Sequence, residues 1–319
     1  MKIVILDANS LGKELDLSVF KSLGALSIYG FTNKEEVIER IRDVDVIITN
    51  KVLLNEANLK HASKLKLICL TATGTNNIDK CYTVKNNIRV CNVINYSTES
   101  VAQHTFAILF YLYENLAYYD KYIKEGTYID DDKYRHYEKR FFELKGKTWG
   151  IIGFGNIGKR VAEIASVFGC NIIYYSTTGK NTNCNYPLVD LDTLMSTSDI
   201  VSIHAPLNER THNLITLREL NTMKPSAYLL NLGRGGIINE EDLVKAIEEK
   251  MVLGVALDVL ENEPMALNSP FIKIKDNPRL FITPHIGWAS VEARNRMVQE
   301  VYKNIEAFSK GEYRNVVSK

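Results

Sequence analysis

The stretch GKTWGIIGFGNIGKRVAEIASVFGCNIIYYSTTGKN, residues 146–181, decides the fold of this chain. Residues 149–152 form a short apolar run of the kind that a buried parallel strand shows. Gly153, Gly155 and Gly158 follow in the spacing G-x-G-x-x-G, and apolar residues then recur at helical spacing until Gly169, which is expected to end the helix. A second apolar run, at 172–175, predicts a return to a strand.

The spacing of the three glycines has a mechanical explanation. The first permits a tight turn, the second lets the backbone approach a pyrophosphate, and the third lets the helix pack on the strand. The helix N-terminus offers free N–H groups and the positive end of its dipole to an anion. The glycine pattern alone is weak, but between a strand and a helix it predicts a dinucleotide-binding unit. The alternative is a glycine-rich turn that binds nothing.

The acidic residue that usually follows such a motif is absent. An Asp or Glu about 20 residues beyond the glycines normally bonds the ribose 2′-hydroxyl of NAD. Residues 174–180 are YYSTTGK, and the next carboxylates, Asp190 and Asp192, lie too far along the chain. Hydroxyls at 176–178 can bond a 2′-hydroxyl or a 2′-phosphate, and Lys180 can attract the phosphate. We therefore expect NADP to be tolerated or preferred over NAD. The alternative is an exposed turn in which Lys180 points into water.

Length and composition restrict the class of protein. A chain of 319 residues is long enough for two ordinary domains, and its 45% apolar and 24% charged content is typical of soluble globular proteins. The net charge of +1 gives no electrostatic reason to expect nucleic acid or an anionic membrane as a partner. No apolar run approaches about 20 residues, and the first residues, MKIVILDAN, predict a strand rather than a signal peptide.

The cysteines favour reduced thiols in a cytoplasmic protein. They are odd in number, scattered and without a C-x-x-C pair, so neither a disulfide framework nor a metal site is indicated. The five are Cys69, Cys81, Cys91, Cys170 and Cys184.

Short apolar runs alternate with helical patterns nearly throughout, which predicts parallel sheets covered by helices. The ten candidate strands fall into two groups, 3–6, 46–49, 67–70 and 89–92, then 148–152, 172–175, 200–204, 228–231, 254–257 and 280–283. A long helix is expected over 98–123 with Ser97 as its N-cap, and a closing helix over 291–308 after Ser290.

Ten strands suit two doubly wound sheets better than one. We therefore expect an α/β protein with two doubly wound parallel-sheet domains and a cleft between them. The Rossmann domain that binds the dinucleotide would span 98–286. A smaller, flavodoxin-like substrate-binding domain would combine 1–97 with 287–319.

Three polar residues follow strands of the second group, namely Arg234, Glu263 and His285. Ligands of doubly wound sheets bind beyond the carboxyl ends of the strands, so these side chains could meet in one site. A nicotinamide supplies hydride but no proton, and histidine is the side chain best suited to donate one near neutral pH. A carboxylate would fix its tautomer, and an arginine would anchor a substrate carboxylate. Taken singly, each residue also suits an ordinary structural role.

Other histidines and a run of aromatic residues are weaker candidates. His204 ends a candidate strand and could line the cofactor site, whereas His104 lies within the long apolar helix, where a hydrogen-bonded core histidine is the default. His61 and His136 lie in polar stretches. The aromatic side chains of 110–122 predict either core or a subunit interface. We expect a homodimer.

Motifs along nearly the whole chain resemble those of D-2-hydroxyacid dehydrogenases, in the family's order. They are GIIGFGNIGKRVA, SIHAPLNERTHNLI, LLNLGRGGIINEEDLVKAI, GVALDVLENEP and TPHIGWAS. TNKVLL, TATGTNNID, VCNVINYSTESVAQHTFA and PHIGWASVEAR are most similar to the glycerate dehydrogenase (hydroxypyruvate reductase) branch. The resemblance implies an enzyme that uses NAD or NADP to reduce a small 2-oxo acid such as hydroxypyruvate or glyoxylate.

The resemblance also implies roles for single residues. His285 would donate the proton, Glu263 would pair with it, and Arg234 would bind the substrate. Asp258 would hold the nicotinamide carboxamide. The cofactor-binding residues are expected to be Gly153, Gly155, Asn156, Ile157, Gly158, Ser176, Thr177, Lys180, His204, Ala205, Pro206, Thr211, Leu232, Gly233 and Asp258. The substrate-binding residues are expected to be Lys51, Thr73, Gly74, Arg234, His285 and Trp288.

Two departures from the family pattern are visible. Ile94 stands where the family usually has proline, which concerns the hinge rather than the chemistry. Ser176 stands where many members carry aspartate. Trp288 is expected to narrow the substrate pocket, although a buttress at a subunit interface is a serious alternative.

Three other functions stay open at this point. Phosphoglycerate dehydrogenase and D-lactate-type dehydrogenases share the motifs. NAD(H)-sensing corepressors of the same fold also keep the three polar residues, so the triad cannot separate them from enzymes. The absence of long disordered tails favours the enzyme.

Overall fold

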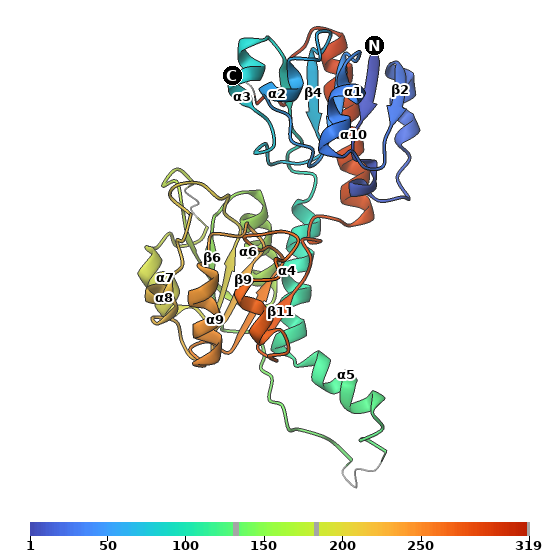
Figure 1. Ribbon diagram of the computed structural model, residues 1–319. Helices are drawn as coiled ribbons and strands as arrows, with labels where there is room; N and C mark the ends of the chain where they lie inside the picture. Colours follow the sequence, from blue (N-terminus) through green and yellow to red (C-terminus); the bar gives the residue numbers. More distant parts are fainter. Residues whose placement is uncertain (130–133, 182–184, 318–319) are drawn as a thin grey trace. The chain divides into compact units, whose positions relative to one another are not determined.

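The chain folds as two compact units, Met1–Ser97 with Ala289–Lys319, and Thr98–Trp288. The computed structural model describes residues 1–129, 134–181 and 185–317. Each unit contains one parallel sheet with helices packed against it (Figure 1). The prediction of two doubly wound parallel sheets is therefore confirmed, whereas the assignment of 1–97 with 287–319 to substrate binding stays a prediction.

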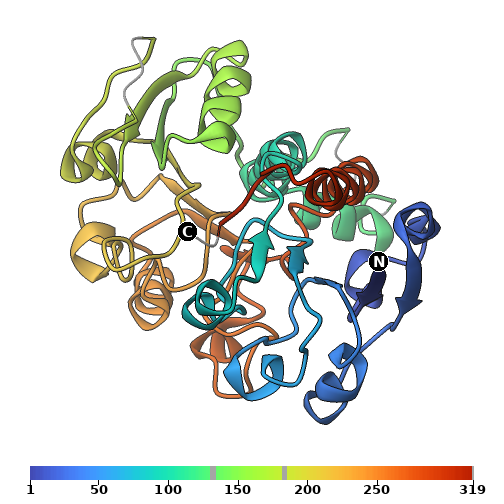
Figure 2. The ribbon, with the colours of Figure 1, turned by 90° about the horizontal axis from the view of Figure 1, so that it is seen from above.

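The first unit has a five-stranded sheet in the order β2-β1-β3-β4-β5. Its strands are β1 Lys2–Ile5, β2 Ala25–Ile28, β3 Val46–Thr49, β4 Leu67–Leu70 and β5 Arg89–Cys91. One face is covered by α1 Val37–Ile41, α2 Glu56–Leu59 and α3 Lys80–Lys85, and α10 Val291–Ser309 lies against the other (Figure 2). The connections include the 3-10 helices η1 Ala8–Leu11, η2 Leu17–Leu23 and η3 Lys34–Glu36.

The second unit has a six-stranded sheet in the order β11-β10-β9-β8-β6-β7. Its strands are β6 Thr148–Ile152, β7 Asn171–Tyr175, β8 Ile200–Ile203, β9 Tyr228–Asn231, β10 Gly254–Leu257 and β11 Leu280–Ile282. One apolar cluster packs α4 Thr98–Tyr113 and α6 Asn156–Val167 on one face. A second cluster packs α7 Leu191–Thr197, α8 Leu217–Leu220, α9 Glu240–Glu248 and η4 Pro270–Ile274 on the other.

The strand order of the second unit positions its site. The chain moves outward from β6 in both directions, to β7 on one side and to β8 through β11 on the other. The sheet therefore has its topological switch point between β6 and β8, and ligands of such sheets bind at the carboxyl ends of the strands there. Gly153 follows β6 and His204 follows β8, so both lie at this point.

Two predictions about the elements are wrong. The described residues form eleven strands rather than ten, because β2 pairs with β1 at the edge of the first sheet. The helix expected over 98–123 is two helices, α4 and α5 Leu116–Lys124, separated at Asn115, whose φ of 54° is left-handed. The closing helix begins after Ser290, whose hydroxyl accepts a hydrogen bond from the Ala293 N–H at 3.2 Å, as expected.

Four strands, β1, β5, β8 and β11, end one residue earlier than predicted, so that His204 and Thr283 lie just beyond β8 and β11. No helix among residues 1–129, 134–181 and 185–317 is long and apolar enough to cross a membrane. The described cysteines, Cys69, Cys81, Cys91 and Cys170, carry free thiols, and Cys184 lies outside the described residues.

Candidate active site

The glycine turn after β6 is shaped by close backbone contacts. Gly153 has a φ of 90°, and a Cβ there would lie 2.7 Å from the Ala205 nitrogen. A Cβ at Gly158 would lie 2.3 Å from the Gly153 oxygen, and one at Gly233 would lie 2.7 Å from the Ala205 oxygen. At Gly155, by contrast, a Cβ would meet nothing within 4 Å. Three glycines are thus required by packing, whereas Gly155 leaves open space at the start of α6.

That open space is suited to an anion. Gly155 caps α6 without a side-chain hydrogen bond, and Asn156 and Ile157 begin the helix. The free N–H groups and the dipole of a twelve-residue helix therefore face the gap beside Gly155. A pyrophosphate fits this arrangement, because the missing side chain lets its oxygens approach the backbone.

A buried hydrogen-bond donor lies at the same edge of the sheet. Trp149 Nε1–H donates to Ser202 Oγ at 2.9 Å, and that hydroxyl lies 3.1 Å from His204 Nε2. Since Ser202 accepts from the indole, its own proton can go to His204 Nε2, which leaves the proton of the neutral imidazole on Nδ1. Nδ1 is buried and has no partner among the described residues. Burial lowers the pKa of His204 to about 3, so the ring is uncharged at neutral pH.

A second unpartnered atom lies where a ribose would be expected. Ser176 follows β7, and its buried Oγ has no partner within the part of the chain that the structure describes. Thr177 is half-buried, whereas Lys180 is exposed. Because unpaired buried polar atoms are costly, Ser176 Oγ and His204 Nδ1 both fit a site completed by a polar ligand.

The acids that follow in the sequence are used elsewhere. Asp190 caps α7 by accepting from the Thr193 N–H at 2.7 Å. Asp192 pairs with Arg218 at 3.1 Å. Both carboxylates thus have partners within the protein.

The remaining cofactor candidates are backbone supports. Thr211 is buried, and its hydroxyl donates to the Pro206 oxygen at 2.7 Å, which fixes the loop after β8. Ala205 supplies the backbone atoms that Gly153 and Gly233 approach, and Leu232 is part of the apolar cluster beneath them. These residues surround the glycine turn with backbone rather than with charged side chains.

His285 and Glu263 form a close pair. His285 Nδ1 lies 2.6 Å from Glu263 Oε2, and both side chains are half-buried. The other carboxylate oxygen accepts from the Leu260 N–H at 3.1 Å, which orients Glu263. An imidazole held through Nδ1 presents Nε2 outward, where it can give a proton to a reacting oxygen. The pairing of these two residues was expected from the family resemblance.

Arg234 lies on a turn that a buried asparagine holds. Asn231 Nδ2 donates to the Arg234 oxygen at 2.9 Å, and Asn231 Oδ1 accepts from the Gly233 N–H at 3.0 Å. Arg234 is exposed, and its Nη1 donates to the Gly233 oxygen at 2.8 Å. A guanidinium that is fixed at its base and accessible at its tip can pair bidentately with a carboxylate.

The Arg234 turn touches the segment that carries Glu263. A Cβ at Gly235 would lie 1.9 Å from the Leu260 oxygen and 2.3 Å from the Glu261 nitrogen, so only glycine allows this approach. The structure therefore brings the segments of Arg234, Glu263 and His285 together in the second unit.

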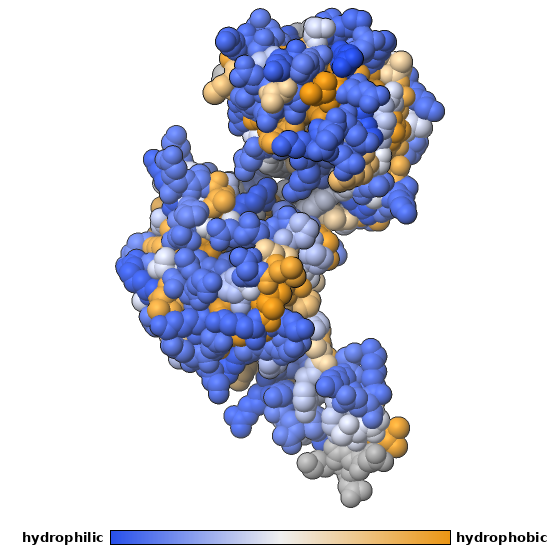
Figure 3. Space-filling view, in the orientation of Figure 1, coloured by the Kyte–Doolittle hydropathy of each residue, from blue (hydrophilic) through white to orange (hydrophobic). Residues whose placement is uncertain are grey.

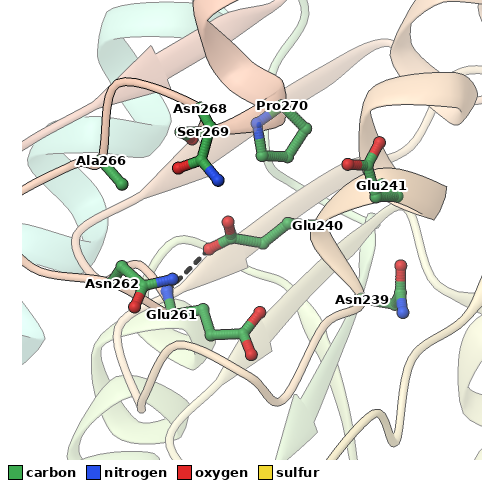
Figure 4. A pocket seen from close by; sticks show the side chains of 9 residues that line it. All are labelled: Asn239, Glu240, Glu241, Glu261, Asn262, Ala266, Asn268, Ser269 and Pro270. Atoms are coloured by element: carbon green, nitrogen blue, oxygen red, sulfur yellow. Dashed lines mark hydrogen bonds between the residues drawn. The ribbon is translucent and has the colours of Figure 1, made fainter.

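Glu240 on α9 also holds this segment. Its carboxylate accepts from the Glu261 N–H at 2.7 Å, as Figure 4 shows. Burial raises the pKa of Glu240, and this hydrogen bond opposes the rise. The small pocket around it is lined by acids and amides, including Glu241, Asn262 and Asn268. The described residues contain no group of three or more His, Cys, Asp or Glu side chains that could hold a metal ion.

Asp258 holds the turn that carries His285. Its carboxylate accepts from the backbone N–H groups of Ile286 and Gly287, both at 2.8 Å, and from the Thr283 hydroxyl at 2.6 Å. Burial acts to raise the pKa of Asp258, but the bonds from His104, Thr283 and the backbone outweigh it, so the pKa lies below its ordinary value. Asp258 is therefore a buried carboxylate with a structural function, beside its predicted function at the nicotinamide.

The predicted substrate residues of the first unit follow β3 and β4. The buried Asp7 carboxylate accepts from the Lys51 N–H at 2.7 Å and from the Asn50 N–H at 2.9 Å, which fixes the backbone of Lys51. Thr73 Oγ1 donates to the Val93 oxygen at 2.8 Å. Lys51 follows β3, and Thr73 and Gly74 follow β4, so all three lie beyond the carboxyl ends of these strands. Lys51 and Thr73 are exposed and Gly74 is half-buried.

Sequence analysis missed the residues that hold this site. Gly235, Glu240 and Asp7 act through contacts with residues that are distant along the chain, and Asn231 acts through hydrogen bonds within its own turn. Trp288, expected at the substrate, packs partly buried against the cluster that includes α4. Residues 233–236 are GRGG, and this density of glycines is the sequence pattern that could have indicated a close backbone contact at Gly235.

Comparisons with known proteins identify the family of the chain. The model of the family described as D-isomer specific 2-hydroxyacid dehydrogenase, NAD binding domain, matches residues 106–287. The chain belongs to this family. It is therefore a nicotinamide-dependent oxidoreductase that acts on 2-hydroxy acids and 2-oxo acids, as the motifs predict.

Relatives match over most of their length. The chain is 34% identical over 327 residues to a hydroxypyruvate reductase of Blautia hydrogenotrophica, with 100% of both chains covered. It is 38% identical to a glyoxylate reductase of Thermococcus litoralis, covering 86% of this chain and 84% of that one. Among solved structures, an acyclic imino acid reductase in complex with NADPH and D-Arg is 30% identical, with a TM-score of 0.88 and coverage of 99% and 100%.

Proposed function

We propose that this enzyme reduces small, polar 2-oxo acids, above all hydroxypyruvate and glyoxylate, to the corresponding D-2-hydroxy acids. The observation that carries the proposal is the 2.6 Å pair of His285 and Glu263 on the segment next to the Arg234 turn. The names of the hydroxypyruvate and glyoxylate reductases that are similar over most of the chain support the choice of substrates.

Each of the candidate residues has a separate role in the proposed reaction. The bound nicotinamide supplies the hydride. Glu263 accepts a hydrogen bond from His285 Nδ1–H and so keeps Nε2 directed at the substrate carbonyl oxygen. Nε2 then gives its proton to that oxygen. Arg234 pairs with the substrate carboxylate through its planar fork. The backbone N–H groups of Thr73 and Gly74 are proposed to bind the same carboxylate, and Lys51 the polar group on C3.

The preference for small substrates rests on Trp288. It follows His285 by three residues, and an indole edge that reaches the substrate from the α4 cluster would leave little room for a bulky substituent. We therefore expect hydroxypyruvate and glyoxylate to be reduced with higher kcat/KM than phenylpyruvate.

NADPH is proposed as a cofactor at least as good as NADH. Ser176 presents a hydroxyl where many members carry a carboxylate, and no acid among the described residues takes its place at the end of β7. A hydroxyl can bond either a 2′-hydroxyl or a 2′-phosphate, whereas a carboxylate would repel the phosphate.

A homodimer is proposed from the segment around α5. We define the arm as residues 116–129 and 134–143. Tyr118 Oη lies 2.7 Å from His136 Nε2, and the ring of Tyr122 stacks on His136 at 4.0 Å, so the two sides of the arm hold each other. Ile129 is 85% exposed and Tyr134 84%, and Figure 3 shows apolar surface beside the grey residues there. Such apolar exposure marks an interaction surface.

A groove next to the base of the arm offers a matching surface. It encloses about 890 Å³ and is lined by the end of α4, the arm and the β11 edge, including Tyr111, Asn115, Arg140 and Phe281. A dimer with twofold symmetry pairs the same patch on both chains, so an arm and a groove on one chain can serve both halves of the interface.

A panel assay with the purified protein tests the function. Rates with NADPH and with NADH are measured for hydroxypyruvate, glyoxylate, pyruvate, phenylpyruvate and 3-phosphohydroxypyruvate at fixed salt. Hydroxypyruvate and glyoxylate should give the highest kcat/KM. Fastest turnover of the phosphorylated acid or of pyruvate would favour the phosphoglycerate or D-lactate alternative. Tight NAD(H) binding without turnover of any acid would favour the corepressor-like alternative.

The same assay tests the cofactor proposal. The kcat/KM for NADPH should at least equal that for NADH, and Ser176→Asp should shift the ratio toward NADH. A wild-type preference for NADH above about 10³-fold, which corresponds to about 4 kcal/mol, would mean that another group excludes the phosphate.

A further inference from the structure

Helix α4 is bonded to the turn that carries His285 at two points one helical turn apart. The Ser100 hydroxyl donates to the Gly287 oxygen at 2.6 Å. His104 Nε2 lies 3.0 Å from Thr283 Oγ1 and 3.5 Å from Asp258 Oδ1. Residues four apart share one helix face, so both bonds come from the face that α4 presents to the turn.

The contacts around His104 assign the direction of each bond. The Thr283 hydroxyl donates its only proton to Asp258 Oδ1 at 2.6 Å, so Thr283 Oγ1 can only accept from His104. His104 Nε2 therefore carries a proton and donates it toward Thr283, with Asp258 as a more distant second acceptor. Removing this N–H leaves Thr283 Oγ1 without its donor inside a largely buried cluster, which is costly to the arrangement.

The close approach of the ring depends on a glycine. A Cβ at Gly287 would lie 3.1 Å from His104 Cδ2 and 2.8 Å from Asp258 Oδ2. His104, Asp258 and Gly287 thus pack directly on one another. The histidine is half-buried and hydrogen-bonded, as the default interpretation of the sequence expects, but its partners are those of the proton donor's turn.

That turn holds His285 in an uncommon conformation. His285 has a φ of 55°, which is left-handed and unfavourable for a residue with a Cβ. The backbone on both sides is fixed, because the His285 N–H donates to the Thr283 oxygen at 2.9 Å and Asp258 binds the next two N–H groups. Strained residues of this kind persist only where the surroundings determine them.

We propose that His104 is a positioning residue for the reaction: through Thr283 and Asp258 it holds the 283–287 turn, and thereby keeps His285 Nδ1 on Glu263. This inference rests on the proposed function in one respect, the assignment of His285 as the proton donor. His104 itself is bonded to the turn and not to the reacting groups. Loss of its N–H lets the turn relax, so that the imidazole is misdirected while the carboxylate and cofactor sites stay intact.

The test compares three variants of the full chain. His104→Leu removes the N–H at similar volume, His104→Gln keeps an N–H near the position of Nε2, and Thr283→Val removes the hydroxyl. We expect His104→Leu and Thr283→Val to lower kcat by about 10–10²-fold, the cost of misplacing a catalytic group by about 1 Å. KM for hydroxypyruvate and NADPH affinity should change little. His104→Gln should restore most of kcat.

A second readout needs neither cofactor nor turnover. In protein labelled with ¹⁵N in the histidine rings, the Nδ1–H signal of His285 is identified by its loss in His285→Asn. We expect this signal to be lost or broadened by exchange with water in His104→Leu, and retained in His104→Gln. The matched control His61→Leu makes the same chemical change at an exposed histidine and should leave the signal and kcat unchanged.

The outcomes separate cleanly. A folded His104→Leu protein that keeps both kcat and the Nδ1–H signal overturns the proposal, and so does an equal loss of kcat in the Leu and Gln variants. If His104→Leu does not fold, Thr283→Val decides by the same two readouts. Wild-type turnover in His285→Asn would defeat the assignment of the proton donor instead, and the Nδ1–H signal would still test His104.

Discussion

His285 combines a strained backbone with a short side-chain hydrogen bond. Its φ of 55° is left-handed, and its Nδ1 lies 2.6 Å from Glu263. Asparagine tolerates the left-handed region better than most residues, so it can occupy this position without disturbing the turn. The site therefore offers a substitution that removes the imidazole and leaves the backbone in place.

The first prediction uses that substitution. His285→Asn should lower kcat for hydroxypyruvate reduction by about 10²–10⁴, the usual contribution of general acid catalysis. NADPH affinity, measured by its fluorescence, should stay close to that of the wild type. Turnover close to that of the wild type at neutral pH would show that another group donates the proton.

The second prediction concerns the fork of Arg234. Arg234→Lys keeps the positive charge but loses the planar pair of donors that matches a carboxylate. We expect kcat/KM for the 2-oxo acid to fall while the dissociation constant of NADPH is nearly unchanged. A collapse of cofactor binding with an unchanged KM for the acid would instead place the arginine in the cofactor site.

At this scale the sequence predicts the three candidate residues that the structure brings together, but not the residues that support them. Arg234, Glu263 and His285 stand after successive strands, and a sheet brings such positions to one edge. The supports have no local pattern. Asn231 bonds its own turn, Gly235 is required by a distant backbone, and His104 becomes informative only when α4 is placed beside Thr283.

Among the elements, buried strands were predictable and the exposed edge strand was not. Three residues of β2, Ala25–Ile28, are exposed and the fourth is half-buried, so the segment lacks the continuous apolar run that marks the other strands. Its pairing with β1 depends on backbone hydrogen bonds at the sheet edge. The break between α4 and α5 was missed for a related reason, since Asn115 adopts its left-handed conformation without a neighbouring glycine or proline.

The contact between β6 and β8 gives a prediction about pH. Trp149 on β6, Ser202 on β8 and the neighbouring His204 form one buried chain, and burial lowers the pKa of His204 to about 3. In the unfolded chain a histidine titrates near pH 6.5. Between these values the unfolded chain takes up a proton that the folded chain does not.

The sign follows from that difference. This contribution to stability is fully present above about pH 6.5 and is lost as the pH falls toward about 3, by up to about 1.4 kcal/mol per pH unit. In His204→Gln, the free energy of unfolding of the second unit should fall less steeply between pH 7 and 5, as measured by urea denaturation followed through tryptophan fluorescence. His61→Gln, an exposed control, should retain the wild-type slope. Parallel curves for His204→Gln and the wild type would contradict the prediction.

At the scale of the whole molecule, the candidate functional residues are divided between the two units. Each unit has its own sheet, its own apolar core and its own set of polar residues at the carboxyl edge. The dinucleotide motif, His285 and Arg234 belong to 98–288, whereas Lys51, Thr73 and Gly74 belong to the first unit.

The arm leads to the last prediction, which concerns the oligomeric state. Ile129 and Tyr137 are 85% and 73% exposed, and the groove of about 890 Å³ lies beside the base of the same arm. Exposed apolar side chains on a projecting segment are stabilised when a second chain covers them, because their surface is removed from water. Sedimentation equilibrium should therefore give twice the 36.2 kDa of one chain.

The double variant Ile129→Asp, Tyr137→Asp places two like-charged, strongly hydrated groups in that interface and should shift the measured mass toward that of one chain. Phe31→Asp, a similar change at a side chain 67% exposed in the first unit, should leave the dimer intact. A wild-type chain that sediments as a monomer at micromolar concentration would show that the arm serves some other contact.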